Sequence, residues 1–469
     1  MRLDRFTPGS ALALAFGCLA VTSLSGAAQD KVAPAAAQRA PAIHPVGHDL
    51  EGLPTSAGPI AAYATALDHP LNRLHALLFF AARTPTEIGA SLPAERRRTG
   101  GSDAQFFTGK WALTNRKGTE IDAQADTRVF GGDVRTSPVE QLSAQAAAEV
   151  RTILASLSTA EQVEALLPVE LARLSLQWDL LQLWWRFENG AGADAETLAA
   201  MARTIRALGL PRSKLEALPS GLDHLDTRAG PAQPGAAHDR RRPRAPSGLL
   251  ADAKSAWVEV DRDSKSLFQA QRSLCSARAF VKCADRATGA ALVARSVELA
   301  AENKLVEIPR GTEVVLLLSM VGLTRDLEPV ATNVASELRL REAVAPDVLD
   351  PASDTSSRDG WNQWVWLFSR SANFAEKGAT PLRFVQDSAQ SLFLEYGSPK
   401  YTTYFAQCAL CHRTTNAGNQ NPSGVNILGR YAQARVLDDP AKRLRDAERE
   451  MEPVVAKLRA RLALADAAK

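Results

Sequence analysis

One five-residue stretch, Cys408-Ala409-Leu410-Cys411-His412, constrains this chain more than any other part of its sequence. Two cysteines three positions apart, followed directly by a histidine, form the attachment signature of c-type haem. Each thiol adds across one vinyl group of the porphyrin, and the histidine then lies under the iron as a nitrogen ligand. With five cysteines and seven histidines in 469 residues, about 8 × 10⁻⁴ chance matches to this pattern are expected. The stretch therefore predicts one covalently bound haem c.

Three other interpretations of the two cysteines stay open. A thioredoxin-like redox pair would follow a strand in a βαβ unit, and the sequence shows no such pattern here. A zinc site would need a second pair of ligands, and no further Cys or His pair follows. A plain disulfide would leave His412 without a role. The haem interpretation uses all three residues, whereas each alternative uses two.

The residues around the motif resemble those of the small soluble c-type cytochromes. Tyr404-Phe405 lies on an expected short helix that leads into the motif, and Asn421-Pro422 and Ile427-Leu428-Gly429-Arg430 follow it. In that family a proline carbonyl accepts a hydrogen bond from the ligand histidine, and an apolar residue packs on the porphyrin. The resemblance, which covers about residues 398–430, implies these two roles for Pro422 and Leu428.

The second axial ligand of the iron is less well defined. In such cytochromes a methionine usually supplies it, and Met451 is the methionine that follows the motif in this sequence. Met451 also lies on an apolar stripe with coiled-coil-like spacing, which indicates a core or interface residue. Pro453 predicts a helix break that could turn the sulfur toward iron. A histidine such as His69 or His75, a water molecule or an open position are the alternatives.

The first 28 residues have the features of a secretory signal peptide. A charged start is followed by an apolar run from Ala11 to Leu24 and by small residues, and cleavage is expected after Ala27 or Ala28. The sequence therefore predicts a periplasmic or secreted protein. Acylation at Cys18 is a weaker alternative, because the residues before it fit a lipobox poorly. Val314 to Leu323 is about half the length of a membrane span, so we expect no transmembrane helix.

Two cysteines, Cys275 and Cys283, are left once the signal peptide and the haem motif are set aside. In an exported protein such a pair predicts a disulfide. On a single helix the two residues would lie about 12 Å apart, which is too far to bridge. Either the segment between them turns or the two cysteines stay reduced, and we expect the disulfide.

Length and composition predict a multidomain α+β protein. After the signal peptide (1–28) and a flexible lead-in (29–58) we expect a mostly helical domain (59–225) and a Pro/Gly/Arg linker (226–248). A β-rich α+β domain, mainly antiparallel with some helix (249–397), and an α-helical haem segment (398–469) follow. The formal net charge of +3 is too small to indicate nucleic-acid binding.

Local patterns predict several elements. A capping-box pattern begins at Ser158, and apolar residues on both faces predict a buried helix over 169–187. A further helix is expected over 194–208. In the second half, an apolar run over 314–321 and an alternating run over 333–341 predict two strands, joined by a hairpin connection at 322–329.

Taken together, the sequence predicts an exported monohaem protein that transfers electrons to or from a redox partner that the sequence does not specify. A haem enzyme or gas sensor with an open iron site is one alternative. A secreted binding or structural protein with an appended haem module is another. The single CxxCH disfavours a two-haem peroxidase, and Asp261-Arg262-Asp263 is too short to indicate a calcium site.

Overall fold

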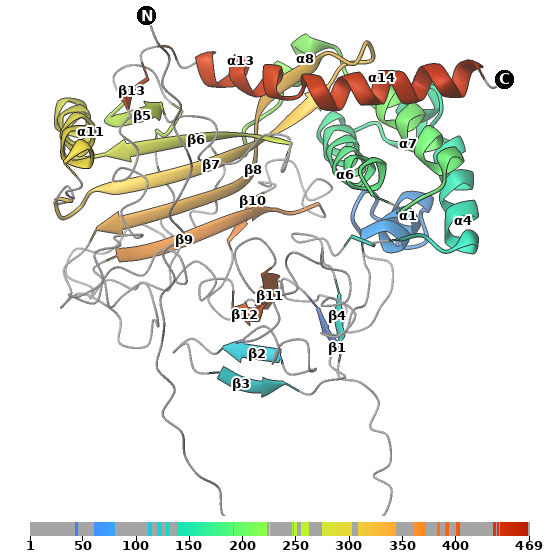
Figure 1. Cartoon of the computed structure of the whole chain (residues 1–469), viewed down its shortest axis with the longest axis horizontal. Coiled ribbons are helices and arrows are strands. Elements are labelled where there is room, and N and C mark those ends of the chain that lie inside the picture. Colours follow the sequence, from blue (N-terminus) through green and yellow to red (C-terminus); the bar gives the residue numbers. More distant parts are fainter. Residues whose placement is uncertain are drawn as a thin grey trace, which may run out of the picture. The chain divides into compact units, whose positions relative to one another are not determined.

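The fold is mixed α+β, with a group of helices, a large antiparallel sheet and three small two-stranded sheets (Figure 1). It is taken from a computed structural model that describes the following residues: 43–45, 61–79, 111–114, 120–123, 128–130, 138–139, 141–190, 192–222, 225, 246, 248–250, 255–261, 274–302, 308–343, 361–370, 382–384, 390–393, 400–403, 435–437, 439 and 441–467.

The first half of the described chain contains a group of helices besides the short strands described below. Its helices are α1 (Pro70–Phe79), α4 (Ala144–Ala155), α5 (Ala160–Leu166), α6 (Glu170–Glu188), α7 (Ala195–Ala207) and α8 (Arg212–Ala217). The capping box at α5 lies one residue later than expected, with Thr159 as N-cap and Gln162 as its partner. Helix α6 is buried on both faces and contacts α7 and the sheet.

The large sheet contains seven strands, all paired antiparallel, in the order β10-β9-β8-β7-β6-β5-β13. Its strands are β5 (Trp257–Asp261), β6 (Cys275–Lys282), β7 (Glu313–Leu323), β8 (Pro329–Ala343), β9 (Trp361–Phe368), β10 (Leu382–Phe384) and β13 (Arg435–Val436). The predicted hairpin joins β7 and β8. Its turn is closed by backbone bonds between Thr324 and both Leu327 and Glu328.

Both faces of this sheet are covered, which explains the continuous apolar run in β7. On one face, Val260, Val281 and Val314 share a core with helix α11 (Arg286–Ala301). On the other face, side chains such as Trp257, Phe280, Val315 and Leu338 share a core with Leu174 of α6 and Leu215 of α8.

Three further strand pairs are small. Strand β1 (Ile43–Pro45) pairs with β4 (Arg128–Phe130), β2 (Trp111–Thr114) with β3 (Glu120–Ala123), and β11 (Gln390–Phe393) with β12 (Lys400–Thr403).

The chain ends in two helices, α13 (Ala441–Glu450) and α14 (Glu452–Ala467), which are separated at Met451 as Pro453 predicts. Helix α13 contacts β6 and β8, and α14 contacts α7 (Figure 1). Ala447, Met451, Val454 and Leu458 belong to the same buried cluster as the apolar residues of α1, α4, α6 and α7. The C-terminal helices therefore complete the core that the N-terminal helices begin.

The predicted disulfide is wrong for this structure, because Cys275 and Cys283 are both free and buried. Cys275 begins strand β6 and Cys283 follows its last residue. Along a strand, eight residues at about 3.3 Å each separate the two residues by about 26 Å, far beyond disulfide reach. The segment between them neither turns nor forms a helix; it is extended.

Candidate functional site

The residues predicted to bind haem, Cys408, Cys411, His412, Pro422 and Leu428, lie outside the described residues. The described chain stops at the end of β12 and resumes at β13. The described residues that bear on the site are of two kinds. The first are the elements that follow the haem motif in sequence, β13 and α13, and the second are the candidate iron ligands Met451, His69 and His75.

The chain that follows the motif joins the edge of the large sheet. Arg435 and Val436 pair with Asp261 and Val260 of β5. The Leu437 N–H then donates a 2.9 Å hydrogen bond to the Glu259 carbonyl. Leu437 is buried, so both backbone pairing and apolar packing hold this point of the chain against the sheet.

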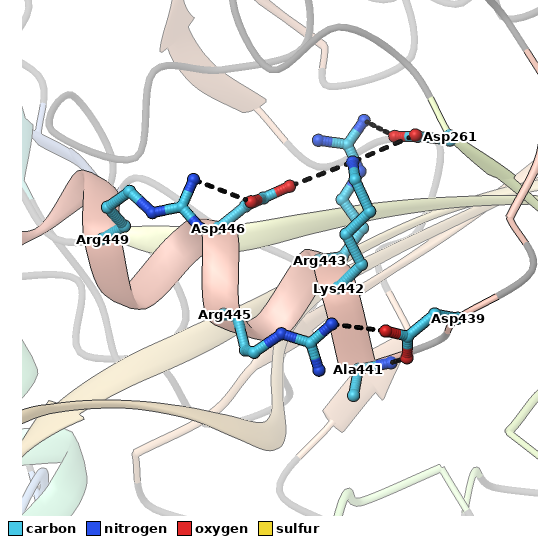
Figure 2. Close-up of polar contacts among 8 residues, drawn as sticks. All are labelled: Asp261, Asp439, Ala441, Lys442, Arg443, Arg445, Asp446 and Arg449. Carbon is cyan, nitrogen blue, oxygen red and sulfur yellow. Dashed lines mark hydrogen bonds and ion pairs between the residues drawn. The ribbon is translucent and has the colours of Figure 1, made fainter.

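A cluster of charged side chains fixes the next element, α13, to the same strand (Figure 2). Lys442 Nζ lies 3.0 Å from Asp261 Oδ2, and Arg443 Nη2 lies 3.1 Å from Asp261 Oδ1. Lys442 also reaches Asp446, at 3.2 Å. The hydrogen bond from Lys442 to Asp261 raises the pKa of that lysine above its ordinary value. We call Asp261, Lys442 and Arg443 the Asp261 cluster.

Met451, the candidate sulfur ligand, is fully buried at the junction of α13 and α14. Its side chain belongs to the apolar cluster that includes Val454, Leu458 and residues of the N-terminal helices. This packing supports the core role that its heptad-like spacing indicates.

The two histidines considered as iron ligands differ in environment. His69 is partly buried, and its Nδ1 accepts a hydrogen bond from the Leu71 N–H at 3.3 Å. His75 is fully buried, and neither of its ring nitrogens has a hydrogen-bond partner. Its ring packs against those of Tyr63 and Phe79, with centroids 5.8 and 5.6 Å away.

Burial makes His75 a neutral side chain. Loss of hydration, with a smaller contribution from the positive charge of Arg370, holds the pKa of His75 well below its usual value. A neutral imidazole is the form that binds metals, but this one is fully buried and packs against two aromatic rings.

A buried ion pair lies near His75. Arg370, just beyond β9, donates from Nε and Nη2 to the two carboxylate oxygens of Asp179 on α6, at 2.6 and 2.5 Å. The Tyr63 hydroxyl donates to Asp179 at 2.5 Å. Burial, followed by the charge of Asp179, raises the pKa of Tyr63 well above its usual value. The Asp179 carboxylate thus binds Tyr63 and Arg370, which come from distant parts of the chain, and joins both residues to α6.

Neither the Asp261 cluster nor the Asp179 pair was identified from the sequence. Asp179, a carboxylate next to Leu180 and Leu181 in the middle of α6, was a usable signal for a buried pair, because an unpaired buried charge is too costly. Its partner lies 191 residues away, and no local pattern marks it. Asp261 was considered only as part of a possible calcium motif.

Two further observations concern metal sites and membrane spans. Among the described residues, no group of three or more His, Cys, Asp or Glu side chains is arranged to hold a metal ion. None of the helices in that part of the chain is long and apolar enough to cross a membrane.

Comparisons with known proteins give no family assignment. No protein-family model, no curated protein and no solved structure matches this chain.

Proposed function

We propose that this chain is an exported protein that carries one covalently attached haem c and transfers electrons through it. The single observation that carries the proposal is the Cys408-Ala409-Leu410-Cys411-His412 motif, whose donor set matches haem attachment at all three positions. The signal peptide agrees with it, because c-type haem is attached to exported chains.

The roles of the individual residues follow from the motif and from the cytochrome resemblance. Cys408 and Cys411 hold the porphyrin through thioether bonds, and His412 provides the axial nitrogen. By resemblance, the Pro422 carbonyl accepts the hydrogen bond that orients His412, and Leu428 packs on the ring. Such a hydrogen bond fixes the imidazole and tunes the metal. When bound, the haem supplies one-electron exchange between ferric and ferrous iron.

A second candidate function is supported by the packing of Met451. A methionine that fills the helical core is not presented to an iron, which favours a haem with another sixth ligand or with an open position. An open position would suit a redox enzyme or a gas sensor.

Haem attachment is tested by producing the full chain in a host that matures c-type cytochromes. We expect a red product whose mass equals the chain without residues 1–27 or 1–28 plus one haem. The Cys408→Ser, Cys411→Ser double variant is the matched control and is expected to be colourless. A colourless wild-type product with the mass of the bare polypeptide would falsify the proposal.

The sixth ligand is tested with Met451→Leu in the haem-loaded chain. Leucine nearly preserves the volume of methionine in the core, so we expect a loss of stability below about 1.5 kcal/mol and an unchanged visible spectrum. Loss of a sulfur-to-iron absorption band in the variant would show that Met451 binds iron after all. Rapid carbon monoxide binding by both proteins would favour the open-site function over electron transfer.

A further inference from the structure

Arg443 has a buried guanidinium whose hydrogen-bonding capacity is largely unused. Its side chain is 6% exposed, and neither Nε nor Nη2 makes a hydrogen bond. Nη2 lies within ion-pair distance of Asp261, but that contact does not have hydrogen-bond geometry. Since buried polar groups are nearly always hydrogen-bonded, these two donors need an explanation.

In other arginines of this chain, the edge of the guanidinium that carries Nε and Nη2 binds a carboxylate. Four other arginines donate from both Nε and Nη2 to a single carboxylate: Arg73 to Glu149, Arg278 to Glu259, Arg370 to Asp179 and Arg461 to Glu188. Two parallel donors on a planar fork match the two oxygens of a carboxylate. In Arg443 this edge is present, buried and without such a partner.

The charges around Arg443 also favour a further anion. Lys442 and Arg443 share one carboxylate, Asp261, while Asp446 is shared between Lys442 and Arg449 (Figure 2). Both cations of the Asp261 cluster lie in the first turn of α13, which contains no acidic residue. The positive end of the helix dipole adds to their charge. The Asp439 carboxylate offsets part of it, because it accepts a hydrogen bond from the Ala441 N–H and pairs with Arg445.

We propose that the Nε/Nη2 edge of Arg443, supported by Lys442, binds a carboxylate group, and that in the loaded protein this group is a propionate of the haem. The assignment of the source rests on the proposed function. The order of the chain supports it, because β13 and then α13 are the first described elements after the segment that carries Cys408, Cys411 and His412.

The first test measures the midpoint potential of the haem-loaded full chain against pH, in the wild type, Arg443→Gln and Arg445→Gln. Arg445 is on the same helix, is 56% exposed and pairs with Asp439, so its variant removes the same charge from the surface. A neighbouring arginine lowers a carboxyl pKa by about one to three units. In the curve of midpoint potential against pH, titration of the propionate produces a step on the acid side. We expect Arg443→Gln to move this step to a pH that is higher by about one unit or more, and Arg445→Gln to leave it in place.

Coincident curves for Arg443→Gln and Arg445→Gln would overturn the propionate assignment. Should Arg443→Gln fail to fold, Lys442→Gln replaces it, because Lys442 is more exposed. An upward shift of the step in Lys442→Gln supports the assignment, and an unshifted step overturns it.

The second test uses sodium acetate as the probe, at constant ionic strength, and follows the thermal unfolding midpoint. Acetate that stabilises the haem-free Cys408→Ser, Cys411→Ser chain but not the loaded chain supports the proposal, since the propionate then occupies the edge. Equal stabilisation of both chains shows that the carboxylate bound by Arg443 is not a haem propionate, and it identifies a site for a free carboxylate. No effect on either chain overturns the site itself. If the wild type acquires no haem, an acetate response lost in Arg443→Gln still supports the site while the proposed function fails.

Discussion

At the scale of single residues, two neighbouring buried groups of the helical core, Asp179 and His75, differ in how they are bonded. Asp179 accepts from both Arg370 and Tyr63, so its charge is compensated inside the core. His75, close to them, has no hydrogen bond at either nitrogen. An unpartnered imidazole is stable there only as the neutral form, and this makes it sensitive to acid.

We expect His75 to weaken the fold as the pH falls. An unfolded histidine titrates near 6.5, and burial lowers the pKa of His75 in the folded state. The unfolded chain therefore binds the proton more readily, and the stability present above pH 6.5 is lost below it. In His75→Phe, the difference in unfolding free energy between pH 7.5 and 5.5 should shrink by up to about 1.4 kcal/mol.

The measurement is urea unfolding at the two pH values. His69→Gln is the control, because it removes a histidine that is only partly buried. An undiminished pH dependence in His75→Phe would contradict the assignment of the acid sensitivity to this residue.

At the scale of elements, two glycines allow helices to pack closely against the large sheet. Gly209, just after α7, lies against the turn between β7 and β8. A Cβ atom at this position would lie 2.5 Å from Arg325 N and 2.5 Å from the Thr324 carbonyl carbon. Gly322 faces side chains instead, and its Cβ would lie 2.8 Å from Leu174 Cδ1.

We therefore expect Gly209→Ala to destabilise the protein more than Gly322→Ala. A leucine methyl can rotate away, whereas a turn backbone cannot move without disturbing its hydrogen bonds. Overpacking typically costs about 1–3 kcal/mol, and we place Gly209→Ala at the upper end of that range. Thermal and urea unfolding of the two variants would check this order, and equal losses would show that the turn adapts.

The elements with strong local patterns were predictable from the sequence, but their long-range partners were not. The two-faced apolar pattern of α6, the caps at Thr159 and Asp194 and the alternation in β8 depend on local physics, so each appears near its expected position. The strand that carries Cys275 and Cys283 was missed because only a helix or a turn was considered for it. The pairing of Asp261 with Lys442 spans 181 residues, and periodicity gives no information about such contacts. The haem motif was recognisable because its chemistry requires fixed local spacing.

At the scale of the whole molecule, the two ends of the described chain share one core. Leu458 of α14 is fully buried in the cluster formed by α1, α4, α6 and α7, whereas Leu464 of the same helix is 66% exposed. A C-terminal helix that only extended a haem module would not need this arrangement.

Leu458→Ala should accordingly reduce the stability of the entire protein by about 2–5 kcal/mol. Leu464→Ala, the same change on the exposed side of α14, should alter it by less than about 0.5 kcal/mol. Urea unfolding followed by tryptophan fluorescence reports on this, because Trp178, Trp184 and Trp185 lie on α6. A local loss that leaves the fluorescence transition unchanged would show that α14 is an independent unit.

The order of strands in the large sheet has a consequence for biosynthesis. Strands β5 to β10 pair in space in the order in which they follow one another in sequence, so each can pair with the preceding strand soon after it is made. The outer edge of β5 pairs with β13, which is synthesised after the other strands of this sheet. Until then a nascent chain presents a bare strand edge, the kind of surface that recruits other chains into aggregates and that chaperones must protect. Any fragment that ends before residue 435 retains this liability.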